Sequence, residues 1–268
     1  AKLMEIRTIM FPDMTDSLDT PLTGKYNMYP RGGTTQEDLV ATGDSKFSIG
    51  IGHDCTENAC VKLDEKCHVK YDVVDVPIGL KATDRFIMSL SHHAGLDVPD
   101  VINDERGRLL DMIADNSKYL YGKRVALFGD PDMLVPLVEF LISMDMKPVY
   151  VVTGSDSKYF NEEMARMLKD ILGAKYMSGE LADTFRLHQW IKQEGVDMIM
   201  GNTYAKYIAR DENIPLIRIG FPIADRPGHN FLPITGYVGA TNMVVKILDA
   251  FLDKQDRTCP EEKVEFQL

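Results

Sequence analysis

Two aspartates four residues apart, Asp111 and Asp115, have a spacing that could serve a metal ion. They fall in an amphipathic stretch with Leu109 and Met112 among its apolar members, so we expect a helix, on which positions four apart share a face. Like charges at this spacing repel unless a cation offsets them, and Arg108 could be that cation. Spacing alone favours a solvated helix face. The sharper alternative is a site for a hard cation, built from carboxylates and water and completed by another chain.

Histidines and cysteines gather between residues 53 and 68, at His53, Cys55, Cys60, Cys67 and His68. Cys60 and Cys67 are seven apart on an expected helix, so about 10 Å apart along its axis at ~1.5 Å per residue. One zinc ion holds its sulfur ligands at ~2.3 Å. We therefore expect buried, reduced cysteines that pack as small apolar side chains. Cys55 is the exception, because a helix N-terminus nearby favours its thiolate.

The run Gly-Asp-Pro-Asp at residues 129–132 joins an expected strand to an expected helix. A glycine turn of this kind can bind phosphate through backbone N–H groups. However, neither G-x-G-x-x-G nor G-x-x-x-x-G-K-[ST] occurs in the sequence, and two aspartates would repel a phosphate. We interpret the run as a helix cap, with Asp132 or Met133 capping and Pro136 confined to the first turn.

Residues 198–229, MIMGNTYAKYIARDENIPLIRIGFPIADRPGH, indicate a strand, a short helix, a second strand and a loop. Loops beyond the carboxyl ends of strands in an open α/β sheet are where ligands and partners bind. Asp225, Arg226 and His229 include an acid and a possible base, but no Ser or Cys nucleophile is marked by an elbow motif. We therefore assign no catalytic residue in this chain.

The elements that would position these residues alternate along the chain. Strands are expected at 46–52, 72–78, 124–128, 147–153, 175–177, 196–200 and 216–219, and helices at 57–68, 82–94, 99–121, 132–144, 161–172, 184–193, 204–210 and 241–254. Continuous apolar strands between amphipathic helices are typical of doubly wound parallel sheets with helices on both faces, an α/β fold. We expect an irregular arm over 1–45, a first α/β domain over 46–121 that ends in the long helix, and a second over 122–268.

Composition narrows the classes of partner. The 30 Lys and Arg against 41 Asp and Glu leave a net charge of −11 over 268 residues, which disfavours nucleic acid and anionic membranes. Four cysteines do not form a disulfide framework, and the apolar runs are too short to span a bilayer. These features suit a cytoplasmic protein.

Five segments, taken together and in order, carry a resemblance to a known family. They are LDTPLTGKYNMYPRGGTTQEDL (18–39), ERGRLLDMIAD (105–115), YGKRVALFGDPD (121–132), MIMGNTYAKYIARD (198–211) and PLIRIGFPIADR (215–226). The sequence resembles the C-terminal half of the β-subunit of nitrogenase component one, the dinitrogenase protein. The short spacer between the last two segments, and DMKPVYVVTG at 145–154, are closer to the vanadium-iron or iron-iron forms.

The resemblance implies a function in a larger complex. In this family an α-subunit carries the catalytic iron-sulfur cofactor, an eight-iron P-cluster at the α–β interface passes it electrons, and an ATP-hydrolysing iron protein supplies them. The complex reduces dinitrogen to ammonia. The family's P-cluster cysteines of the β-subunit lie in its N-terminal half, and none of Cys55, Cys60, Cys67 or Cys259 matches them. The resemblance therefore implies that this chain holds no cluster ligand and is inactive alone.

The resemblance also changes the interpretation of the two aspartates. In the family, two aspartates on this helix join an Arg-Glu pair of the second β-subunit to bind a divalent cation at the β–β interface. The matching positions are Asp111 and Asp115, which become the expected metal ligands. Residues 198–229 become a family signature whose role is packing and subunit contact.

Two alternatives remain open from the sequence. One is a cofactor-assembly scaffold of the same superfamily, which builds the cluster instead of using it. The other is a non-catalytic α/β module that binds a small ligand or a partner at the mouth of its sheet.

Overall fold

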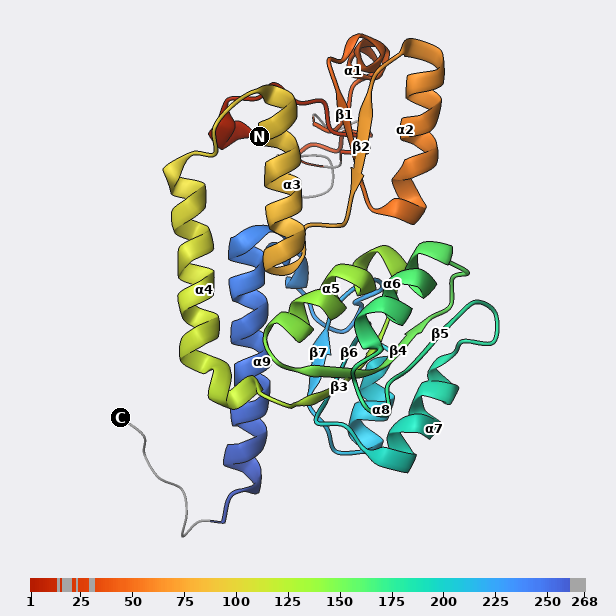
Figure 1. Cartoon of the computed structure of the whole chain (residues 1–268), viewed down its shortest axis with the longest axis vertical. Helices are drawn as coiled ribbons and strands as arrows, with labels where there is room; N and C mark the ends of the chain where they lie inside the picture. Colours follow the sequence, from red (N-terminus) through yellow and green to blue (C-terminus); the bar gives the residue numbers. More distant parts are fainter. Residues whose placement is uncertain (14, 16–20, 23, 29–31, 261–268) are drawn as a thin grey trace.

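Five parallel strands form the main sheet, in the order β5-β4-β3-β6-β7 (Figure 1). The computed structural model describes residues 1–13, 15, 21–22, 24–28 and 32–260. The strands are β3 (Arg124–Phe128), β4 (Lys147–Thr153), β5 (Lys175–Ser178), β6 (Met198–Gly201) and β7 (Leu216–Arg218). The chain enters this sheet at the central strand β3 and continues outward through β4 to the edge strand β5. It then crosses to β6 and β7 on the other side of β3.

Helices cover both faces of this sheet, as the apolar strands predict. Along β3, Val125 and Leu127 belong to the core formed with α5, α6 and α9, whereas Ala126 and Phe128 belong to the core formed with α7 and α8. The helices are α5 (Pro131–Ser143), α6 (Lys158–Leu168), α7 (Thr184–Glu194), α8 (Ala205–Asp211) and α9 (Gly236–Thr258). The expected doubly wound α/β fold is confirmed.

Two further helices, α3 (Gly79–Ala94) and α4 (Asp100–Leu120), extend the helical layer. Figure 1 shows α4 lying alongside α9, and the two helices are in contact. Leu109 and Leu120 of α4 are fully buried in the same core as Met243 and Ile247 of α9. The long helix that we assigned to the first domain therefore packs on the last helix of the chain. We call α3 to α9, residues 79–258, the main lobe.

A smaller unit sits beside α5 and α6 (Figure 1). It contains α1 (Gln36–Ala41), β1 (Ser48–Ile51), α2 (His53–Cys67) and β2 (Tyr71–Val74). Its two strands are parallel and pair only with each other among the described residues. We call residues 36–74 the small lobe. Short 3-10 helices occur at Lys2–Met4, Thr42–Asp44 and His229–Phe231.

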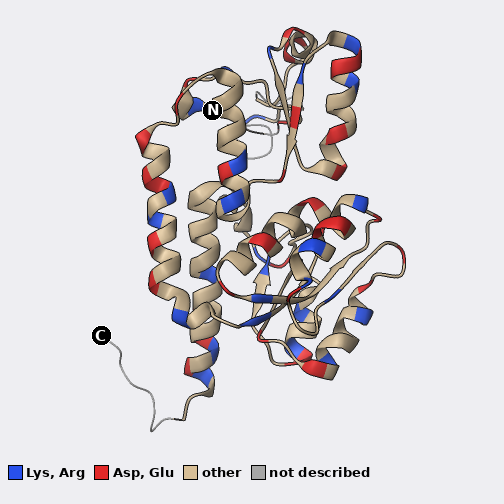
Figure 2. Ribbon diagram, viewed as in Figure 1, with Lys and Arg blue, Asp and Glu red and all other residues tan. Residues whose placement is uncertain are grey.

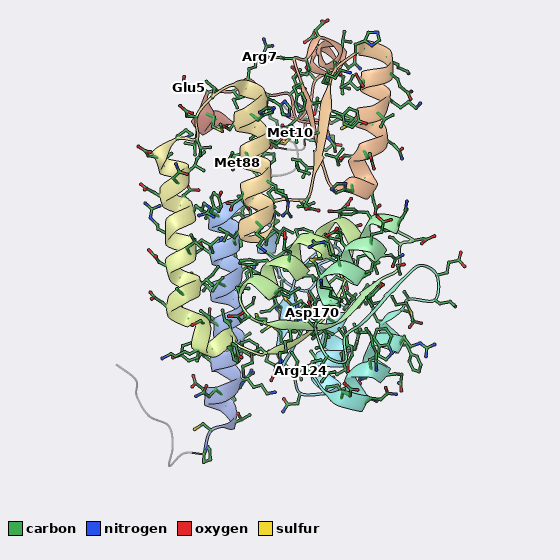
Figure 3. All side chains as sticks on the ribbon, in the orientation of Figure 1. Glu5, Arg7, Met10, Met88, Arg124 and Asp170 are labelled. Carbon is green, nitrogen blue, oxygen red and sulfur yellow. The ribbon has the colours of Figure 1, made fainter. Side chains whose placement is uncertain are left out.

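The N-terminal segment lies at the end of the molecule that carries the small lobe, as the labelled Glu5, Arg7 and Met10 show in Figure 3. Met4 is buried in the core of the main lobe. The arm over 1–45 includes α1, which the sequence did not predict. Parts of its segment 18–39 lie outside the described residues.

Several expected helix starts differ from the structure: α9 begins at Gly236, five residues earlier than expected, and α3 and α6 each begin three residues earlier. Helix α5 begins at Pro131, with Asp130 as its cap, and Pro136 lies inside the helix instead of in its first turn. Helix α2 begins at His53, four residues earlier than expected. Its start has no side-chain cap of its own, so no local signal marked it. None of the described helices is long and apolar enough to cross a membrane.

Candidate functional site

Asp111 and Asp115 lie on the solvent-facing side of α4. The helix turns its apolar face toward α9, with Leu109 and Leu120 fully buried, and this leaves both carboxylates exposed. Figure 2 shows acidic segments repeated along α4. The helical spacing thus places the two predicted ligands on one accessible face.

Two carboxylates supply only part of a divalent-cation site. Calcium takes six to eight oxygen ligands and magnesium six, some of them water. Among the described residues, no three His, Cys, Asp or Glu side chains gather where they could hold a metal ion. Asp111 and Asp115 can therefore serve as one side of a site whose other ligands come from outside this chain.

The cysteines are placed differently from our expectation. All four are free thiols, and of the three in α2 only Cys60 is buried, while Cys55 and Cys67 are exposed. The expectation of a Cys55 thiolate is wrong. Partial burial raises the pKa of the Cys55 thiol to about 11, and the nearby Asp132 and Asp130 carboxylates add to the shift.

An iron-sulfur cluster needs several thiolates that converge on it. Cys55, Cys60 and Cys67 instead follow one another along α2, over about 18 Å at ~1.5 Å per residue. Cys259 comes just after α9, at the far end of the chain. The described cysteines do not fit such a cluster.

The mouth of the main sheet carries an open pocket of about 320 Å³. It lies at the carboxyl ends of β3, β4 and β6, beside the point where the strand order reverses between β3 and β6. Its polar lining includes Asp130, Ser155, Asp183 and Asn202, and Phe221 lies at its edge with 91% of its surface exposed. This is the position at which α/β sheets bind ligands.

The loop after β7 is held through Asp225, which binds side chains from β7 and from the loop after β6. Arg218 donates to both carboxylate oxygens of Asp225, at 2.8–3.1 Å, and the Thr203 hydroxyl donates to the same carboxylate at 3.0 Å. These bonds hold the pKa of Asp225 well below its usual range. These partners therefore stabilise Asp225 as an anion, which makes it a weak base.

Sequence reasoning missed one polar cluster, formed by Asp75, Arg85, Glu139 and Tyr159. Together with other residues it lines a cavity of about 250 Å³ where the small lobe meets α5 and α6. The only local signal was an aspartate at the end of an apolar strand. Its partners come from three different helices, so the sequence pattern did not connect them.

Comparison with known proteins identifies the family. The nitrogenase component 1 type oxidoreductase family matches residues 2–252. The chain belongs to this family. The resemblance drawn from the five sequence segments is confirmed.

Similar curated proteins include nitrogenase molybdenum-iron protein beta chains. The one from Clostridium pasteurianum is 47% identical over 264 residues, which cover 98% of this chain and 57% of that protein. The one from Bradyrhizobium diazoefficiens is 38% identical, covering 95% of this chain and 49% of that protein. The chain thus spans about half the length of the curated relatives it matches. None of these names supports the expected vanadium-iron or iron-iron type.

Solved structures agree with this grouping. A chain of nitrogenase Cp1 at pH 6.5 superposes with a TM-score of 0.97 at 46% identity, covering all of this chain and 58% of that one. A chain of nitrogenase Cp1 at pH 5 has a TM-score of 0.62 at 14% identity and covers 87% of this chain and 52% of that one, which shows a shared fold.

Proposed function

We propose that this chain is part of the β-subunit of a dinitrogenase, whose αβ complex reduces dinitrogen to ammonia with electrons from an ATP-hydrolysing iron protein. The observation that carries the proposal is 47% identity to a β chain over 98% of this chain, together with a TM-score of 0.97 to a nitrogenase chain. The names of the relatives support a molybdenum-iron complex over the assembly scaffold, and we assign the catalytic cofactor to the partner α-subunit. A cytoplasmic location follows from this function.

The contribution of this chain is to fold and assembly, not to redox chemistry. Its described cysteines do not converge on a common point, which supports a place for the P-cluster ligands of the subunit in the remainder of the protein. When bound there, the P-cluster relays electrons to the α-subunit. This chain supplies the sheet and helices on which the rest of the subunit, the α-subunit and the iron protein assemble.

We further propose that Asp111 and Asp115 bind a divalent cation at an interface with a second β-subunit. Both carboxylates are exposed on one face of a rigid helix, and α4 is anchored by Leu109 and Leu120 in the core. Two carboxylates neutralise the charge of a divalent ion, and the remaining oxygen ligands come from the second subunit and water.

The cation site is tested by divalent-metal titration of the assembled full-length complex, using calorimetry. We expect Asp111→Ala and Asp115→Ala each to weaken binding at this site at least 10-fold, because a lost carboxylate removes both a ligand and a charge. Asp249→Ala, an exposed aspartate on α9, is the matched control and should bind like the wild type. Equal binding by all four proteins contradicts the proposal.

The function itself is tested on the full-length subunit purified with its α partner. We expect iron-rich complexes that reduce acetylene and dinitrogen when iron protein and ATP are added. A complex that carries iron clusters and transfers them to another protein, without reducing substrate, indicates the assembly scaffold instead. A protein without iron that binds a small molecule indicates a binding module, for which the pocket at the sheet mouth is the candidate site.

A further inference from the structure

The small lobe meets the main lobe with little apolar contact. Within residues 36–74, all of which are described, Ile49 is the one aliphatic side chain that packs on the main lobe's apolar core, and the rings of Phe47 and His53 stack on His93 and Tyr159. The core of the small lobe itself is thin, because α2 buries only Cys60 and all four residues of β2 are half-buried. A two-stranded sheet is marginal in water by itself. We call the contact between the two lobes the seam. Polar contacts across the seam must therefore contribute much of the attachment of the small lobe to the main lobe.

The first polar contact runs from the main lobe to the small lobe. The Asp132 side chain, at the start of α5, is 5% exposed and accepts the backbone N–H groups of Asp54 and Cys55, both at 3.0 Å. These are two of the unpaired donors at the N-terminus of α2, which has no cap of its own. Gly52 permits the approach, since a Cβ there would lie 2.8 Å from Asp132 Oδ2.

The second polar contact lies just past the end of β2. Asp75, which is 6% exposed, accepts from Arg85 Nη2 at 2.7 Å and from the Tyr159 hydroxyl at 2.6 Å. Arg85 on α3 also donates to both oxygens of Glu139 on α5, at 3.3 and 2.6 Å. Burial raises the pKa of Tyr159 far above its usual range, so its hydroxyl remains a donor. The Asp75 carboxylate therefore joins the end of the small lobe directly to α3 and α6, and through Arg85 to α5.

The seam between these contacts is polar and loosely packed. The ring of His53, the first residue of α2, stacks on Tyr159 with a centroid separation of 3.8 Å. Beside them lies the cavity of about 250 Å³, lined by charged and apolar side chains. A polar cavity of this size can admit water. Water can then form hydrogen bonds with the groups that pair across the seam. Separating the small lobe from the main lobe therefore exposes little apolar surface.

We propose that the small lobe opens from the main lobe as one unit, and that Asp75 and Asp132 hold it closed from opposite sides of the seam. Such an opening is a local unfolding event whose free energy lies below that of the whole molecule. The two carboxylates contribute to that free energy because each satisfies buried donors, and Asp72 of β2 adds contacts to Ser89 and His93 of α3 at 2.8 and 2.7 Å. This proposal is independent of the nitrogenase function, since it rests only on contacts within the chain.

Hydrogen-deuterium exchange of the 268-residue chain, resolved by mass spectrometry, tests the proposal. We expect Asp132→Asn and Tyr159→Phe each to accelerate exchange of the amides in β1, α2 and β2 roughly 5- to 10-fold or more, the effect of one lost buried hydrogen bond. Amides of β3, β4 and β6 should keep their rates. Asp225→Asn is the matched control, because it removes a paired carboxylate within the main lobe, and it should leave the small lobe unchanged.

Wild-type exchange rates in the small lobe of both variants overturn the proposal. So does an equal acceleration in β3, β4 and β6, which would mean that the molecule opens as a whole. Tyr159→Phe removes a single hydroxyl and keeps the ring stacked on His53. The exchange rates of the Tyr159→Phe variant therefore test the proposal even where Asp132→Asn folds poorly.

Discussion

At the scale of single residues, a side chain from a distant element decides the chemistry at the start of α2. Cys55 stands where the helix N-terminus by itself would favour a thiolate. The carboxylate of Asp132 occupies that N-terminus instead, bonded to the N–H groups of Asp54 and Cys55. The negative charge and the burial together make the thiolate less stable than in water. The Cys55 thiol is therefore expected to be a poor nucleophile at neutral pH.

We therefore predict that Cys55 alkylates slowly despite its exposure. With a pKa of about 11, the thiol is almost fully protonated at pH 8, and we expect iodoacetamide to modify it roughly 20-fold more slowly than N-acetylcysteine in the same buffer. The rate should rise with pH and reach half of its maximum near pH 11. Peptide mass spectrometry at several pH values provides the measurement. A half-maximum below pH 9 would show that the helix N-terminus outweighs Asp132.

At the scale of elements, the approach of α3 to α5 depends on a glycine. Gly79 begins α3 with a positive φ of 81°, and a Cβ there would lie 2.4 Å from Cγ of the buried Phe140. No rotamer change removes this clash, because Phe140 is enclosed by the core. Gly107, within α4, has no atom within 4 Å of its hypothetical Cβ. Packing therefore requires a glycine at position 79 but not at position 107.

We predict opposite effects from the same substitution at these two positions. Gly79→Ala should lower the free energy of unfolding by about 2–4 kcal/mol, through overpacking and a strained backbone. Gly107→Ala should raise it by about 0.5–1 kcal/mol, because alanine loses less entropy in a helix. Urea denaturation followed by circular dichroism measures both. A Gly79→Ala protein as stable as the wild type would mean that the α3–α5 contact is looser than the structure shows.

At the scale of the whole molecule, packing crosses the boundary that we expected near residue 122. Helices α3 and α4 precede it, yet their buried faces pack on α5 and α9. Leu109 is fully buried among side chains that include Met243 and Val244 of α9. The chain therefore builds one of its two cores from both sides of that boundary, with α3, α4, α5, α6 and α9 together.

We predict that residues 1–121 do not form an independent folded unit. Without α5 and α9, the apolar faces of α3 and α4 are left in water, and the two strands of the small lobe are too few to replace that core. Circular dichroism and hydrogen exchange of the fragment should show low helicity and amides that exchange at unprotected rates. The complete chain is the control. A cooperative thermal transition in the fragment would show that the first domain stands alone.

Much of this protein follows from its sequence alone. The alternation of apolar strands with amphipathic helices predicts the doubly wound class, because strand and helix periodicities are local properties of the chain. Five ordered segments identify the family, and the spacing of Asp111 and Asp115 places both on one helix face. These conclusions need only neighbours within a few residues, or a pattern shared with relatives.

Other features were decided only by tertiary structure. Asp132 binds the N-terminus of α2 across 78 residues of sequence, and Tyr159 binds Asp75 across 84. Burial raises the pKa of Cys55 and the Asp132 contact adds to the shift, while both long-range contacts connect the two lobes. No local pattern encodes them, because they depend on how the chain path brings buried donors and acceptors together. The sequence therefore determined the elements and the family, and the fold determined which polar groups meet at the seam.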